Sequence, residues 1–94
     1  MNKTQKGLNG FIDLCLSCTN ESLFEALFDL FLTEEEKSDL ALRYLIVKEL
    51  LKKEKSQREI AKSLNVSIAK ITRGSNELKR IDKKLLKHLK DKLL

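Results

Sequence analysis

The 94-residue sequence contains no proline and only three glycines. Average usage would supply about five prolines at this length, so the chain has little of the turn chemistry that connects strands. No apolar run approaches the roughly 20 residues needed to span a bilayer, and no apolar stretch of a secretory signal follows the N-terminal lysines. The scarcity of turn residues favours an all-α protein, and a length of 94 residues corresponds to one domain, residues 1–94.

Chemically reactive residues are also scarce. The two cysteines, Cys15 and Cys18, lie three apart in an apolar-periodic segment, and the single histidine, His88, is far away in sequence. A redox pair or half of a zinc site remains an alternative. We favour two small residues near the buried face of a helix, because a structural zinc site needs four ligands. No acid–base or nucleophile arrangement is evident, so we expect no enzyme, no metal and no cofactor.

The charges are divided unevenly along the chain. Residues 1–49 carry a net charge of −4, whereas residues 50–94 carry +9. A basic half favours a polyanionic partner such as DNA, RNA or an anionic membrane. A solvated lysine surface would give the same composition, so charge alone does not choose between these interpretations.

Apolar residues at helical spacing predict three helices in the first half, at about 8–18, 22–31 and 33–53. Two capping boxes, Ser22 with Glu25 and Thr33 with Glu36, are predicted to begin the second and third. The second helix is apolar over most of its circumference and must be covered on several sides. One small chain offers too little cover, so the pattern predicts a homodimer whose chains wrap around each other.

Arg43 is the one charge in the apolar run 40–47 of the third helix. Arginine is almost never buried without a partner. Its guanidinium therefore either extends to the surface or faces a cleft and meets an anion there.

The basic half contains the pattern of a helix-turn-helix. Ser56 with Glu59 forms a third capping box, and Ala61 is small enough for two helices to cross closely. Asn65 suits a turn position with positive φ, and Ser67 can cap the next helix. An apolar quartet supplies the expected core: Ile60, Leu64, Val66 and Ile71. Because pattern and charge agree independently, we favour DNA binding over a plain helical hairpin.

The run Ile71-Thr72-Arg73-Gly74-Ser75-Asn76, together with the helix-turn-helix before it, resembles the tryptophan repressor family. Leu30 to Thr33 and Arg43 to Leu51 match as well, and the resemblance covers about residues 22–94. It implies a bacterial, cytoplasmic repressor with six helices per chain, an intertwined homodimer, double-stranded operator DNA as partner and L-tryptophan as corepressor. The implied regions are a dimerisation core at 8–53, a helix-turn-helix at 56–75 and a C-terminal helix at 82–93.

The resemblance also assigns ligand-binding residues. It places the indole ring between Arg43 and Arg73, and the ligand carboxylate on Arg73. The ammonium would meet the carbonyl groups of Leu30 and Leu32. The remaining assigned residues are Thr33 beside those carbonyls, Gly74, which allows close approach, and Glu77, where the family often has serine.

For DNA, the resemblance implies that Arg58 contacts bases and that the helix after Ser67 enters the major groove. The other assigned residues divide into groove contacts and phosphate contacts: Ile68, Ala69 and Lys70 for the first, and Gln57, Thr72 and Lys79 for the second.

Two further functions remain open. The first is a helix-turn-helix protein that binds DNA without an effector. The second is a membrane-surface module built on the helix at 83–92, although its leucine face, formed by Leu85, Leu86, Leu89 and Leu93, is more typical of a packed core.

Overall fold

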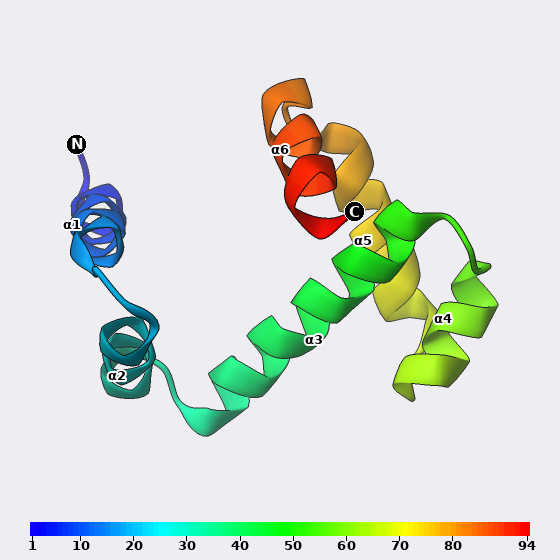
Figure 1. Ribbon diagram of the computed structural model, residues 1–94, viewed down its shortest axis with the longest axis horizontal. Coiled ribbons are helices and arrows are strands. Elements are labelled where there is room, and N and C mark those ends of the chain that lie inside the picture. Colours follow the sequence, from blue (N-terminus) through cyan, green and yellow to red (C-terminus); the bar gives the residue numbers. More distant parts are fainter. The chain divides into compact units, whose positions relative to one another are not determined.

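A computed structural model describes all 94 residues (Figure 1). The chain forms six α-helices and no strand, which confirms the predicted all-α, six-helix chain. None of these helices is long and apolar enough to cross a lipid bilayer. The bounds are α1 Lys3–Ser17, α2 Glu21–Phe31, α3 Glu34–Lys52, α4 Gln57–Leu64, α5 Ile68–Arg80 and α6 Lys83–Leu93. The chain divides into two compact units, residues 1–38 and 39–94, and the expected single domain stays a prediction.

The first two helices begin at asparagines. Asn2 caps α1 through its side-chain oxygen, which accepts from the backbone N–H of Gln5 at 2.8 Å. This helix therefore begins five residues before the apolar period does. The capping box predicted at Ser22 and Glu25 is wrong. Asn20 has the extended backbone of a cap and accepts from the N–H of residue 23, so Ser22 lies inside the first turn of α2.

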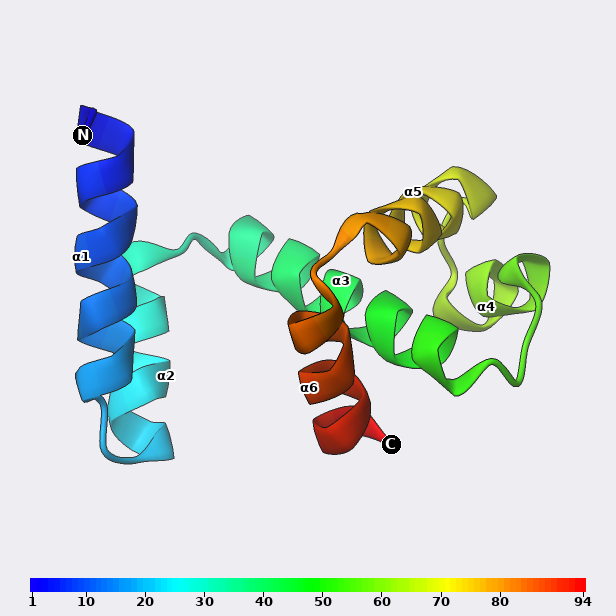
Figure 2. The same ribbon diagram turned by 90° about the horizontal axis from the view of Figure 1, so that it is seen from above.

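In the first unit, α1 and α2 lie side by side and pack through phenylalanine rings (Figure 2). The ring of Phe11 in α1 lies 6.4 Å from that of Phe28 and 5.3 Å from that of Phe31, both in α2. Neither helix has a buried residue, and Leu16 and Leu30 are 79% and 78% exposed. A single chain therefore leaves much of this apolar surface in contact with water.

The turn between α2 and α3 is fixed by polar side chains. Glu36 N–H donates to Thr33 Oγ1 at 3.1 Å, and Thr33 N–H donates to Glu36 Oε1 at 2.9 Å, which confirms the predicted capping box. Lys37 Nζ lies 2.7 Å from both Asp29 Oδ1 and Glu34 Oε1. Hydrogen bonds to Asp29 and then Glu34 raise the pKa of Lys37. The end of α2 is thus tied to the start of α3.

The core of the second unit forms where α3, α4 and α5 meet. Ile60 and Ile71 are fully buried, beside Ile46 and Ala61. Leu42, Leu50, Leu64 and Val66 pack against this cluster. All four members of the predicted quartet are therefore part of the core, and α3 supplies the remaining wall that the helix-turn-helix cannot provide for itself.

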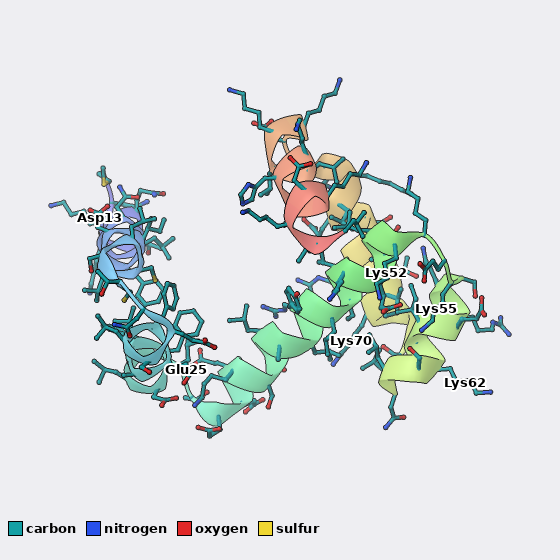
Figure 3. All side chains as sticks on the ribbon, in the orientation of Figure 1. Asp13, Glu25, Lys52, Lys55, Lys62 and Lys70 are labelled. Carbon is teal, nitrogen blue, oxygen red and sulfur yellow. The ribbon has the colours of Figure 1, made fainter.

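The connection from α3 to α4 is short and contains two lysines, Lys53 and Lys55. Lys53 follows the last residue of α3 in the left-handed conformation, with φ of 56°. The carboxylate of Glu49 lies 3.3 Å from Lys52 Nζ and 3.5 Å from Lys55 Nζ, two residues labelled in Figure 3. These ion pairs hold the connection against the end of α3 and so help to position α4.

Candidate nucleic-acid interface and ligand cavity

Local hydrogen bonds shape the helix-turn-helix as the sequence predicts. Ser56 and Glu59 form the capping box, with Glu59 N–H to Ser56 Oγ at 3.1 Å and Ser56 N–H to Glu59 Oε1 at 2.9 Å. The hydrogen bond from the Ser56 backbone lowers the pKa of Glu59. Asn65 is left-handed, with φ 56° and ψ 50°. Ser67 caps α5 by accepting from the N–H of Lys70 at 3.3 Å.

Small and apolar residues let α4 and α5 cross closely. Ala61 is 4% exposed, and its carbonyl accepts from the N–H of Val66 at 2.9 Å. This bond spans the turn at Asn65 and satisfies a carbonyl at the end of α4. The angle between α4 and α5 therefore follows from both side-chain packing and backbone hydrogen bonding.

The structure brings together most residues assigned to DNA. Thr72 Oγ1 in α5 donates to Gln57 Oε1 in α4 at 2.7 Å. Arg58 is exposed in the first turn of α4, and Ile68, at the first turn of α5, is 45% exposed. Lys79 is exposed but lies eleven residues after Ile68, about 16 Å further along the α5 axis. Lys79 therefore lies at the C-terminal end of α5, whereas Ile68 lies at its N-terminal end.

A cavity of about 620 Å³ lies beside the helix-turn-helix, within the second unit. Its walls come from three helices and the turn after α5. Four residues assigned to the ligand line it: Arg43, Arg73, Gly74 and Glu77. The other lining residues are Asp39, Leu42, Ile46, Val47, Lys70, Leu78, Ile81, Leu85 and Leu89. Arg43 is exposed to this cavity and is not buried without a partner.

The sequence predicts the charged residues of this cavity better than its apolar residues. The α3 residues that line it recur at positions 39, 42, 43, 46 and 47, which is one helical face. The spacing from Arg43 could therefore have identified Asp39 and Ile46. Leu85 and Leu89 belong to the leucine face expected of α6, but that periodicity does not indicate the cavity, because it does not show what the face packs against.

Gly74 is the point of close approach between α5 and α3. A Cβ atom there would lie 3.0 Å from Ile46 Cγ2 and 3.4 Å from Leu50 Cδ1. The first distance is tighter than ordinary packing allows. The missing side chain therefore lets the two walls of the cavity meet.

Comparison with known proteins bears on these two surfaces. The Trp repressor protein family model matches residues 6–93. A Trp operon repressor homolog of Chlamydia trachomatis serovar D is 47% identical over 81 residues, covering 86% of each chain. The chain belongs to the Trp repressor family. The homolog of Chlamydia caviae is 46% identical over 87 residues, covering 93% of this chain and 86% of its own. The homolog of Vibrio campbellii is 46% identical over 68 residues, covering 72% of this chain and 68% of its own.

The other ligand residues expected of a Trp repressor family member lie in the first unit. Leu30, Leu32 and Thr33 surround the end of α2. The N–H of Leu32 donates to the carbonyl of Phe28 at 2.8 Å, whereas the carbonyls of Leu30 and Leu32 accept no backbone hydrogen bond. They remain available as acceptors at the negative end of the helix dipole.

Outside these surfaces, the structure contains no group of three or more metal-ligating side chains placed to hold an ion. Cys15 and Cys18 are free, half-buried thiols in this Trp repressor family member. The thiol of Cys18 donates to the carbonyl of Leu14 at 3.6 Å.

Proposed function

We propose that this protein is a cytoplasmic, tryptophan-dependent transcriptional repressor whose homodimer binds operator DNA when L-tryptophan is bound. The observation that carries the proposal is the dual role of α5. Its first turn presents Ile68 and Ala69 at the exposed end of the helix-turn-helix, and its middle supplies Arg73 and Gly74 to the cavity. A ligand in the cavity would therefore press on the helix that enters the major groove.

The cavity suits an aromatic amino acid. Arg43 on α3 and Arg73 on α5 can stack their guanidinium planes on the two faces of an indole ring. Arg73 can also hold the ligand carboxylate. The free carbonyls of Leu30 and Leu32, with Thr33 beside them, would accept from the ammonium.

Glu77 is proposed as a further partner of the ammonium. It lines the cavity, and its Oε1 lies 3.6 Å from Arg80 Nη1 in an exposed ion pair that contributes little to stability. Glu77→Ser should weaken L-tryptophan binding and leave indole-3-propionate, which lacks the ammonium, nearly unaffected. Calorimetric titration with both ligands measures this. If Glu77→Ser changes the affinity for both ligands equally, or mainly strengthens DNA binding without ligand, Glu77 does not contact the ammonium.

On DNA, Arg58 would contact bases, with Ile68, Ala69 and Lys70 at the groove behind the Ser67 cap. Gln57, Thr72 and Lys79 would contact phosphates. The hydrogen bond from Thr72 to Gln57 supports this division, because it occupies the amide oxygen and leaves the amide N–H groups to donate to an anion.

Two titrations test the function as a whole. The first is calorimetry of the full-length protein with L-tryptophan. The second is binding of operator DNA with and without saturating L-tryptophan. Tryptophan should raise specific DNA affinity, and operator DNA should raise tryptophan affinity by the same factor. An unchanged DNA affinity would instead support a helix-turn-helix protein that needs no effector.

A further inference from the structure

The charges around the cavity are of both signs, and most of them have no partner within the chain. Three cations, Arg43, Lys70 and Arg73, line it together with two carboxylates, Asp39 and Glu77. Of these five, only Glu77 belongs to an ion pair, with Arg80, which does not line the cavity. The cavity therefore presents unneutralised positive and negative groups above walls that are otherwise apolar.

Asp39 is the carboxylate of the cavity lining that belongs to no ion pair. It lies one turn before Arg43 on α3, so both residues occupy the same helical face. Their side chains do not form an ion pair, and Asp39 makes no side-chain hydrogen bond in the chain. It does not cap α3, because Thr33 and Glu36 perform that role.

A purely anionic ligand would meet repulsion from this carboxylate. A zwitterion would not, because its carboxylate can pair with an arginine while its ammonium pairs with the aspartate. Charge-assisted hydrogen bonds of this kind are stronger than neutral ones. An exposed carboxylate gains less than a buried one, so the effect of Asp39 on affinity is moderate.

We infer that Asp39 is a specificity-determining residue, which pairs with the α-ammonium of the ligand and selects an amino acid over the corresponding carboxylic acid. This inference rests on the proposed function, since it names a contact within the same cavity. It adds a contact from α3 to the ammonium acceptors proposed on α2 and at Glu77. The cavity would then recognise all three parts of the ligand: ring, carboxylate and ammonium.

The test compares two ligands on three proteins by calorimetric titration at neutral pH. The ligands are L-tryptophan and indole-3-propionate. The proteins are the full-length wild type, Asp39→Asn and the control Asp13→Asn. Asp13 lies on α1, is not a lining residue of the cavity and forms no ion pair. Its substitution makes the same change in net charge as Asp39→Asn. Asp39→Asn should weaken L-tryptophan binding about three- to tenfold and leave indole-3-propionate within twofold. Asp13→Asn should alter neither.

Three results would overturn the inference. Equal weakening of both ligands would mean that Asp39 acts on Arg43 or on folding, which circular dichroism of the variant would distinguish. Unchanged L-tryptophan binding would mean that the ammonium lies elsewhere. Failure of the wild type to bind L-tryptophan would overturn the proposed function as well, and that outcome is visible before any variant is compared.

Discussion

At the scale of single residues, the three glycines of this chain lie in two different environments. A Cβ atom added at Gly7 or Gly10 of α1 would have no neighbour within 4 Å, whereas one at Gly74 would lie 3.0 Å from Ile46. Ile46 is 5% exposed and β-branched, so it has little freedom to move away. The space around each glycine therefore determines the sign of the effect of alanine: the gain in helix propensity remains where there is room, and overpacking opposes it where there is none.

We expect Gly74→Ala to destabilise the protein by about 1 kcal/mol, since overpacking outweighs the gain in helix propensity. Gly7→Ala should stabilise it by about 0.5–1 kcal/mol, because only the propensity changes. Urea denaturation of both variants measures the difference. A stabilised Gly74→Ala variant would show that α3 and α5 separate easily, against the close contact between Gly74 and Ile46.

The caps of α3, α4 and α5 lie where the sequence predicts them, whereas the cap of α2 is Asn20 and not Ser22. The spacing of Ser22 and Glu25 is a local pattern, and Asn20 two residues earlier is an equally good cap. The local sequence therefore does not determine which of the two residues caps α2. At Asn65 no rival existed, because the helix-turn-helix requires a left-handed residue at that one position.

At the scale of elements, the capping box of α4 makes the stability of the helix-turn-helix depend on pH. Hydrogen bonds from Ser56 hold the pKa of Glu59 below its ordinary value of 4.5. A lowered pKa in the folded state contributes stability that is fully present above pH 4.5 and is lost as the pH falls through the lowered value.

Glu59→Gln should therefore reduce the fall in melting temperature between pH 6 and pH 3, because it removes a carboxylate whose ionised form is stabilised. Thermal unfolding followed by circular dichroism measures this fall. Glu54→Gln is the matched control, since Glu54 forms no ion pair or side-chain hydrogen bond. If both variants change the fall equally, the capping box is not its source.

The two ends of the proposed DNA-binding surface should respond differently to substitution. Arg58→Ala should cost about 1–3 kcal/mol on the operator and relax the base preference at one position. Lys79→Ala should weaken binding to all sequences alike and lower the salt slope by about one. Fluorescence anisotropy at several salt concentrations measures both. Equal, sequence-independent losses would contradict the assignment of Arg58 to bases.

Elements far apart in sequence account for what sequence analysis missed. Arg43 and Arg73 were expected at the ligand from the family resemblance, and both line the cavity. The wall formed by Leu85 and Leu89 was not expected, because nothing local to α6 indicates which helix it packs against. Periodicity identifies an apolar face, but it does not identify what covers that face.

At the scale of the whole molecule, the uncovered surface of α1 and α2 predicts the oligomeric state. Neither helix buries a residue within one chain, and Phe31 and Leu23 are about half exposed. Apolar patches of this kind mark interfaces between chains. Light scattering at micromolar concentration should show a dimer. A folded monomer at that concentration would contradict the intertwined arrangement, which the resemblance implied and which the surface supports.

The division of charge between the two units has a kinetic consequence. Residues 1–38 carry a net charge of −4 and residues 39–94, which contain the helix-turn-helix, carry +9. If the proposed function holds, a duplex approaching by diffusion would be attracted to one unit and repelled by the other, so unproductive encounters would be shortened. The rate of association, more than the lifetime of the complex, should therefore fall as salt screens these fields over a Debye length of about 10 Å at 0.1 M.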